Sequence, residues 1–203
     1  GRIAALVGSS VGGFQAVEWA VEEPERFERL VLIATAAKAS PWTIAIDETQ
    51  RMAIEADATF GERRDDAGMK GLAAARAIGL LTYRGGEGYN LTQQDREELP
   101  PVHRASTYQQ YQGEKLCRRY NAYSYYAILD AFDTHDVGRG RGGVAAALGG
   151  IRARTLVVGI TTAILFTPPA MPELHGQIPG SLYRQRDPPS APDRLLAQAH
   201  PLA

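Results

Sequence analysis

A serine set between glycines is the feature of this sequence most suited to chemistry. The segment Gly8-Ser-Ser-Val-Gly12 has the pattern G-x-S-x-G, with Ser10 at its centre. Where such a segment turns sharply from a strand into a helix, the serine hydroxyl is exposed as a nucleophile for acyl transfer. Glycines on both sides keep Cβ atoms out of the tight turn, and the amide of Val11 can donate to an oxyanion. Ser10 is thus the predicted nucleophile, and Val11 a predicted oxyanion-hole donor.

Two other interpretations of these glycines are possible. A glycine turn with an incidental serine is disfavoured by its surroundings, because Ile3–Val7 predicts a strand before it and Phe14–Glu22 a helix after it. A phosphate-binding loop is disfavoured because the segment contains neither G-x-G-x-x-G nor G-K-[ST]. The strand–turn–helix context therefore favours the catalytic interpretation.

The elements that would position Ser10 predict an α/β fold. The apolar run Arg29–Ala34 predicts a strand buried on both faces, which is typical of a parallel sheet. The sheet is expected to continue with Arg154–Ile160 and, after a helix near Pro172–Gln177, with Ser181–Gln185. A buried parallel strand needs neighbours on both sides, so we expect further strands upstream of Ile3–Val7.

The stretch between the second and third predicted strands has a helical pattern. Helices are predicted at Trp42–Ala58, Met69–Tyr83, Tyr108–Arg118 and Asn121–Phe132. The first prediction depends on Ile44, Met52 and Ile54, while Gly85–Gly88 predicts a break and Asn90–Ser106 a polar loop.

These patterns divide the chain into a sheet-bearing core and an insertion. Residues 1–40 and 149–203 are predicted to form the core, and residues 41–148 a helical lid over the active-site end of the sheet. The N-terminal strands of the sheet are expected to be missing from this sequence.

Composition places the chain among soluble globular domains. It has 203 residues, 44% of them hydrophobic, and a formal net charge of −1, which offers no footprint for nucleic acid or an anionic membrane. Cys117 is the only cysteine, and its helical surroundings predict a half-buried structural thiol in a reducing compartment. No apolar run has the length of a membrane span and no signal peptide is evident, so a cytoplasmic location is expected.

Several segments beyond the elbow resemble the homoserine O-acetyltransferase family, which includes relatives that act on serine or deacetylcephalosporin C. The resembling segments are Gly8–Ala20, Ala75–Tyr83, Tyr111–Lys115, Asn121–Tyr125, Phe132–Arg141 and Gly159–Phe166. The resemblance implies an α/β-hydrolase fold with a mostly parallel sheet and an inserted helical lid. It also implies acetyl transfer from acetyl-CoA to homoserine through a Ser10 acyl-enzyme in methionine biosynthesis, with no bound cofactor or metal, and a homodimer formed through the lid helices.

The resemblance also assigns substrate-binding residues. Arg76 matches the arginine that holds the amino-acid carboxylate, Tyr83 a tyrosine that lines that site, and Asp193 the aspartate that binds the amino group. Without the resemblance, Arg76 would be interpreted as a partner in an ion pair on a helix surface.

The resemblance fails at the other triad positions. Ala163 stands where the acid is expected and Pro192 where the histidine is expected. The chain's histidines are each predicted to be surface or structural: His103, His135, His175 and His200. A serine without its base is a poor nucleophile.

Three functions therefore remain open: an acyltransferase, a catalytically inactive remnant that binds a ligand or partner, and a hydrolase of the same fold. The motifs leave open homoserine or serine as acceptor, and acetyl or succinyl as the donated group.

Overall fold

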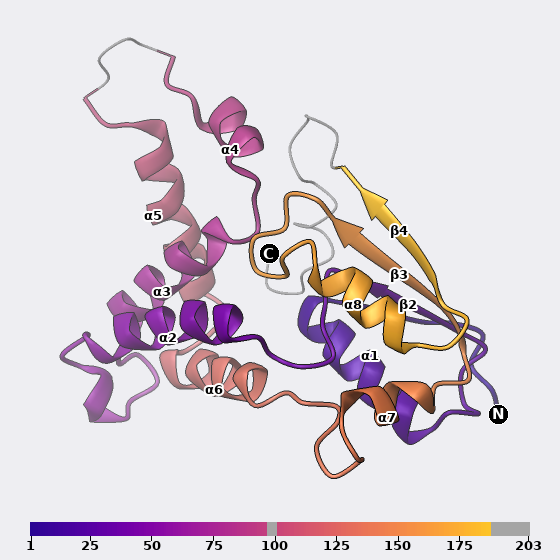
Figure 1. Cartoon of the computed structure of the whole chain (residues 1–203). Coiled ribbons are helices and arrows are strands. Elements are labelled where there is room, and N and C mark those ends of the chain that lie inside the picture. Colours follow the sequence, from indigo (N-terminus) through magenta and orange to yellow (C-terminus); the bar gives the residue numbers. More distant parts are fainter. Residues whose placement is uncertain (97–100, 188–203) are drawn as a thin grey trace.

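The sheet of this protein has four parallel strands in the order of the sequence. The computed structural model describes residues 1–96 and 101–187. The strands are β1 (Leu6–Ser9), β2 (Arg29–Ile33), β3 (Arg154–Ile160) and β4 (Leu182–Arg186). Their order is β1-β2-β3-β4, and every neighbouring pair is parallel (Figure 1). The predicted α/β fold with a parallel sheet is thus confirmed.

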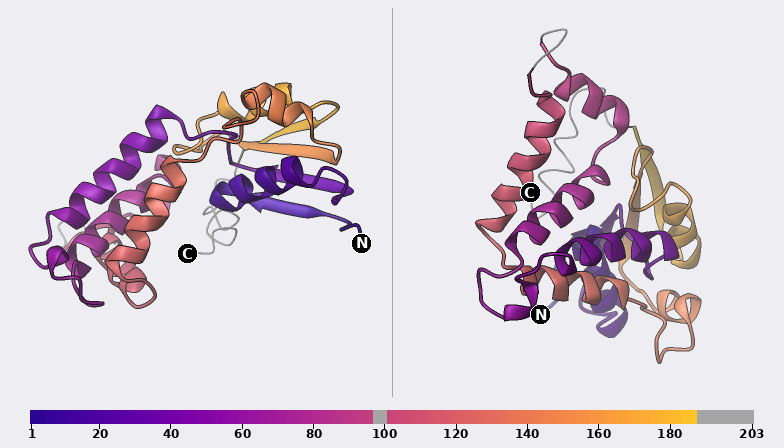
Figure 2. Two further views of the ribbon diagram at one scale, coloured as in Figure 1. Left: turned by 90° about the horizontal axis from the view of Figure 1, so that it is seen from below. Right: turned by 90° about the vertical axis from the view of Figure 1, so that its left-hand side faces the viewer.

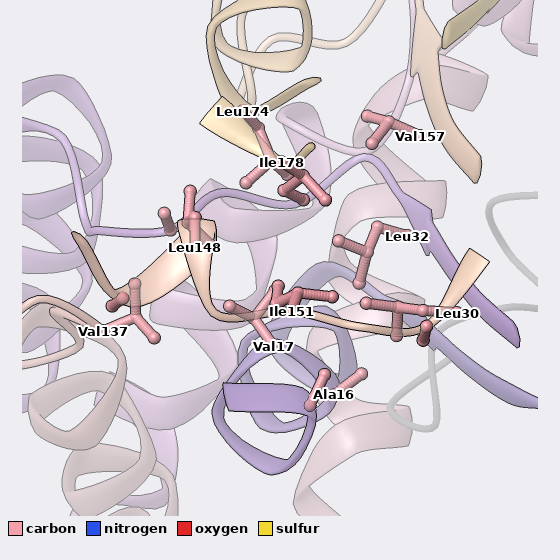
Figure 3. Close-up of a cluster of buried hydrophobic side chains, with 14 of the residues drawn as sticks. Ala16, Val17, Leu30, Leu32, Val137, Leu148, Ile151, Val157, Leu174 and Ile178 are labelled. Carbon is pink, nitrogen blue, oxygen red and sulfur yellow. The ribbon is translucent and has the colours of Figure 1, made fainter. Parts of the chain in front are cut away.

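Three helices cover one face of the sheet: α1 (Ser10–Glu22), α7 (Val144–Gly149) and α8 (Ala170–Gln177). Right-handed crossovers between strands that follow one another in order place their helices on the same side. The resulting core contains Leu30, Leu32 and Val157 from the strands, packed against Val17, Leu148 and Leu174 (Figure 3).

Burial of the strand residues alternates as a consequence. Leu30 and Leu32 are buried under the helices, whereas Val31 and Ile33 are only partly buried in the described part of the chain. The prediction that Arg29–Ala34 is buried on both faces is therefore wrong for these residues. The physical reason is that α1, α7 and α8 all lie on one face.

The first strand lies at the edge of the described sheet. β1 pairs with β2 on one side only, and Val7 is 62% exposed. The strand begins later than the predicted Ile3–Val7, because the chain bends at Ala4 and Ile3 forms only an isolated bridge to Phe27.

The residues between β2 and α7 form a bundle of helices beside the sheet (Figure 2). Its elements are α2 (Pro41–Glu55), the short η1 (Phe60–Glu62), α3 (Met69–Leu81), α4 (Gly86–Gln93), α5 (Arg104–Cys117) and α6 (Ala122–Asp133). Helix α3 contacts α2, α5 and α6, around a core that includes Ile54, Leu72, Leu116 and Leu129. Within residues 1–96 and 101–187, no helix combines the length and apolarity needed to cross a membrane.

Two predictions within the bundle need correction. The helices do break before α4, but the break covers Thr82–Gly85, and the glycines from Gly86 onward form the first turn of α4, which closes with a hydrogen bond from the Tyr89 amide to the Gly85 carbonyl. The polar segment Asn90–Ser106 is not all loop, because α4 continues to Gln93 and α5 begins at Arg104, where the Asp95 carboxylate accepts from the Arg104 amide.

Helix α2 turns a largely polar face inward. Ile44 and Met52, on which its prediction rested, are 38% and 58% exposed, and only Ile54 of the three is buried. The other residues of α2 that are buried are Thr43, Asp47, Gln50 and Arg51. A buried face that is mostly polar is unusual for a helix that only packs against a hydrophobic core.

Candidate active site

Ser10 stands on a strained turn at the carboxyl end of β1. Its φ of 51° lies in the left-handed region, which costs a residue other than glycine about 1–2 kcal/mol. Its amide donates to the Ala34 carbonyl at 3.1 Å, and Thr35 Oγ1 donates to the Ser10 carbonyl at 2.8 Å. Ala34, just past β2, itself has a φ of 43°. The ends of two adjacent strands thus hold Ser10 in this conformation.

The glycines around Ser10 have unequal roles. A Cβ on Gly8 would lie 2.4 Å from the Gly12 carbonyl oxygen, so glycine is required there. A Cβ on Gly12 would meet no described atom within 4 Å, whereas one on Gly13 would lie 2.4 Å from Thr35 Oγ1. The prediction that Gly12 prevents a backbone clash is therefore wrong, and Gly13 has that role because α1 crosses close to Thr35.

Two small cavities meet at Ser10. The first is lined by Ser10, Val11, Asp47, Gln50, Thr82, Tyr83, Tyr125, Ile128, Leu129, Phe132 and Leu165. The second is lined by Ser10, Ala34, Thr82, Tyr83, Thr162, Ala163, Leu165 and Phe166. The fold therefore brings Val11, Tyr83 and Ala163 to the predicted nucleophile, and it places the bundle at the carboxyl ends of the strands.

Val11 lies in the first turn of α1, where helix amides have no acceptor within the helix. Its amide is thus in a position suited to an oxyanion. Pro192 and Asp193, the other predicted positions near the site, lie outside the described residues, as does His200.

Arg76 is buried next to the site rather than paired on a helix surface. It is 3% exposed, its Nη1 has no hydrogen-bond partner within residues 1–96 and 101–187, and its Cζ lies 5.2 Å from the centre of the Tyr83 ring. The surface ion-pair interpretation is therefore wrong. An arginine buried without a carboxylate partner is costly, so this position favours an anionic ligand. Burial also raises the pKa of Tyr83, which keeps its hydroxyl protonated as a donor.

A cluster of buried polar residues next to Ser10 was not predicted from the sequence. Asp47 Oδ1 accepts from Gln50 Nε2 at 2.8 Å, and Gln50 Oε1 accepts from the Tyr125 hydroxyl at 2.7 Å. Burial and the neighbouring Asp133 carboxylate raise the pKa of Asp47 to about 8. The available signal was the helical spacing of Thr43, Asp47, Gln50 and Ile54, which places polar side chains on the same stripe as the buried isoleucine.

Of the histidines that the structure describes, none lines either cavity at Ser10. His103 contacts Asp95, and His175 Nδ1 lies 2.7 Å from Ser181 Oγ. His135 is stacked on Phe14, and burial lowers its pKa. Ala163, at the expected acid position, has no group that could orient a base. Among the described residues there is no cluster of histidine, cysteine and carboxylate side chains able to hold a metal.

Comparison with known proteins identifies the fold family. The α/β-hydrolase fold family matches residues 1–190. Homoserine O-acetyltransferase of Cyclobacterium marinum is 44% identical over 184 residues, which cover 91% of this chain and 52% of that protein. The chain thus spans about half the length of the curated relatives it matches.

Solved structures agree. A homoserine O-acetyltransferase from Staphylococcus aureus aligns with a TM-score of 0.75 and 25% identity over 97% of this chain and 55% of that one. An acetylester hydrolase from Corynebacterium glutamicum aligns with a TM-score of 0.83 and 24% identity over 98% of this chain and 57% of that one. This chain, with its serine elbow between a parallel strand and a covering helix, belongs to the α/β-hydrolase fold family.

Proposed function

We propose that this chain is an acyl-transfer unit of the homoserine O-acetyltransferase type, acting in the cytoplasm in methionine biosynthesis. The observation that carries the proposal is the strained Ser10 at the carboxyl end of β1, beside cavities that the helical bundle closes. The similarity to homoserine O-acetyltransferases over nine-tenths of the chain supports the choice of reaction.

The proposed reaction has two steps. Ser10 Oγ attacks the thioester carbonyl of acetyl-CoA and gives up its proton, while the C–S bond breaks and coenzyme A leaves as the thiol. The γ-hydroxyl of homoserine then attacks the acetyl-serine, the bond to Ser10 Oγ breaks, and Ser10 regains a proton. In both steps the Val11 amide stabilises the negative charge on the carbonyl oxygen.

Arg76 and Tyr83 are proposed to hold the carboxylate of the amino acid. Support comes from the unpartnered Arg76 Nη1 and from the Tyr83 ring that packs against this guanidinium and lines both cavities. A guanidinium can bind a carboxylate through two parallel hydrogen bonds. Asp193 remains a proposed contact of the amino group, outside the described residues.

A second candidate function is binding without turnover. It is favoured by Ala163, which lines the cavity at Ser10 where a triad needs its acid, and by the lack of a histidine in both cavities. Loss of triad members lowers the rate by about four to six orders of magnitude. The proposed acetyl transfer by this chain alone is therefore slow.

The test is transfer of radiolabelled acetyl from acetyl-CoA to L-homoserine by the chain and by its Ser10→Ala variant. We expect slow formation of O-acetylhomoserine that Ser10→Ala abolishes and that Ser106→Ala, at an exposed serine of α5, leaves unchanged. Homoserine binding without any Ser10-dependent product would instead establish the second function. Release of free acetate without transfer would identify a hydrolase.

Self-association through the helical bundle is also proposed. The bundle exposes Leu81, Leu91 and Tyr111 by 51%, 64% and 50%, on three helices that contact one another through α5. A contiguous exposed apolar patch marks a surface that binds another molecule, and we propose that these three side chains belong to such a patch. Sedimentation velocity should give a dimer that Tyr111→Lys dissociates.

A further inference from the structure

The first cavity at Ser10 contains one carboxylate, Asp47 of α2. Asp47 is 4% exposed, and its Oδ2 has no hydrogen-bond donor among the described residues. A buried acceptor left without a donor costs about 1–3 kcal/mol. The position therefore favours a ligand that brings a donor into this cavity.

The Asp47 carboxylate is held in place by other buried groups. Gln50 Nε2 occupies its Oδ1, and the Tyr125 hydroxyl holds Gln50 from α6. Gly79 of α3 leaves room for this series of hydrogen bonds, because a Cβ there would lie 2.5 Å from Gln50 Oε1. Among the described residues no donor reaches Oδ2 of Asp47, which shares its surroundings with the Asp133 carboxyl.

The charge around Asp47 favours a cation. Arg51 of α2 pairs with three carboxylates: Glu48 of α2, and Asp130 and Asp133 of α6. The nitrogen–oxygen distances are 2.7, 3.5 and 2.7 Å. Asp47 adds a further carboxylate beside Asp133, whose Oδ1 also has no donor. The charge of one arginine is thus shared among several carboxylates.

The opposite charge lies on the next helix. Arg76 of α3 is buried with Nη1 unpartnered, and it contacts Tyr83, which lines the same cavity as Asp47. A buried acceptor and a buried donor, each unpartnered, match the two charged groups of an amino-acid zwitterion.

We infer that Asp47 binds the α-ammonium group of the hydroxy amino acid whose carboxylate Arg76 holds. This rests on the proposed function, because it takes such an amino acid as the ligand. An ammonium group has three N–H donors, so a contact with Asp47 leaves two donors for other acceptors. The pair of charges makes the site specific for an α-amino acid over a simple hydroxy acid.

Ionisation of Asp47 follows from this binding. The charged and titratable groups that interact with it are Asp133 and Tyr125 from α6, Arg51 from α2 itself, and Tyr83 just past α3, while Arg76 of α3 acts on the same two tyrosines. A cation placed at Oδ2 favours the charged carboxylate. Binding at pH 7 should therefore release a proton from Asp47.

The test compares binding of L-homoserine with binding of 4-hydroxybutanoate, which lacks only the amino group. Calorimetry on the wild-type chain should show a preference for homoserine of about tenfold or more, the value of a charged hydrogen bond. Asp47→Asn should remove this preference by weakening homoserine alone. Asp130→Asn, which removes an exposed carboxylate of the Arg51 network outside the cavity, should retain it.

Proton release provides a second readout. Binding enthalpies measured in two buffers of different ionisation enthalpy should show release by the wild-type chain and none by Asp47→Asn. An unchanged preference in Asp47→Asn, or equal weakening of both ligands, would overturn the role of Asp47 while leaving the proposed function intact. Failure of the folded wild-type chain to bind either ligand would overturn both.

Discussion

Two aspartates of the α2 region, Asp47 in the middle of the helix and Asp57 just past its C-terminal end, have contrasting surroundings. Asp57, just past the C-terminal end, accepts from the Thr59 amide and hydroxyl at 3.0 and 2.8 Å, and from the Lys70 and Gly71 amides at 3.0 Å each. These hydrogen bonds lower the pKa of Asp57 to about 2. Asp47 accepts from Gln50, the donor found for it among the described residues, and burial together with the charge and hydrogen bonding of the Asp133 carboxyl raises its pKa to about 8.

This difference distinguishes Asp57, a carboxylate with a structural role, from Asp47, a carboxylate with an oxygen available to a ligand. The donors around Asp57 connect the end of α2 to the first turn of α3, whose free amides need acceptors. Asp47 has an oxygen with no donor, in the cavity that reaches Ser10. Sites that bind ligands often reduce the stability of the empty protein, and Asp47 fits that pattern.

The largest expected effect is that Asp47→Asn stabilises the protein. The folded state keeps a proton on Asp47 up to about pH 8, whereas the unfolded chain releases it near 3.8. The free energy of unfolding of the wild type therefore falls as the pH rises from about 4 to 8. Asparagine cannot ionise and can donate to Asp133, so it should raise that free energy at pH 8 by on the order of 3 kcal/mol.

Urea denaturation between pH 5 and 8.5 measures this effect. The curves of wild type and Asp47→Asn should diverge as the pH rises, while Asp130→Asn should follow the wild type. Parallel curves, or a less stable variant at pH 8, would contradict the assignment of an unsatisfied, proton-bearing Asp47.

Two glycines of α3 extend the comparison to packing. An alanine at Gly71, near Asp57, would place its Cβ 2.6 Å from the Ala53 carbonyl oxygen and 2.7 Å from Ile54 Cα, both backbone atoms of α2. An alanine at Gly79 would instead meet the Gln50 side chain, which can move. Gly71→Ala should thus cost about 1–3 kcal/mol of stability.

Gly79→Ala should have a smaller effect on stability, because alanine gains about 1 kcal/mol of helix propensity over glycine. Its effect should fall on ligand choice, since moving Gln50 frees the Asp47 carboxylate to rotate. Thermal melts and the homoserine preference of both variants measure the contrast. Equal losses of stability would show that the two ends of the helix pair pack alike.

The sequence predicted most reliably what depends on neighbours along the chain. β3 at Arg154–Ile160 was predicted with its observed bounds because its run of apolar and β-branched residues has no helical period. Ser10 was found because the elbow motif is local, and the strand and helix on either side followed the motif's usual context.

The features that the sequence did not predict depend on contacts between residues that are far apart along the chain. The helix α2 was predicted from apolar residues, which usually form the buried face. Here the buried face lines a cavity, so Asp47 and Gln50 are buried instead of Ile44 and Met52. The surroundings of Asp47 come in part from α6, a helix far along the chain. This helix supplies Asp133 and also Tyr125, whose hydroxyl donates to Gln50. Arg76 was chosen by resemblance alone, because its spacing equally suits a surface pair.

The smallest expected effect is at Asp57 and has the opposite sign in pH. Its folded pKa of about 2 lies below the ordinary aspartate value of 3.8, so its stabilisation is present above about pH 4 and is lost as the pH falls toward 2. Asp57→Asn should lower the melting temperature at pH 7 by a few degrees, because asparagine accepts fewer and weaker hydrogen bonds. The melting curves of variant and wild type, followed by circular dichroism from pH 7 down to 2, should converge at the acid end, where the wild-type carboxylate is itself protonated. A constant difference across that range would mean that the Asp57 side chain acts by packing rather than by charge, and the contrast between the two aspartates would then rest on Asp47 alone.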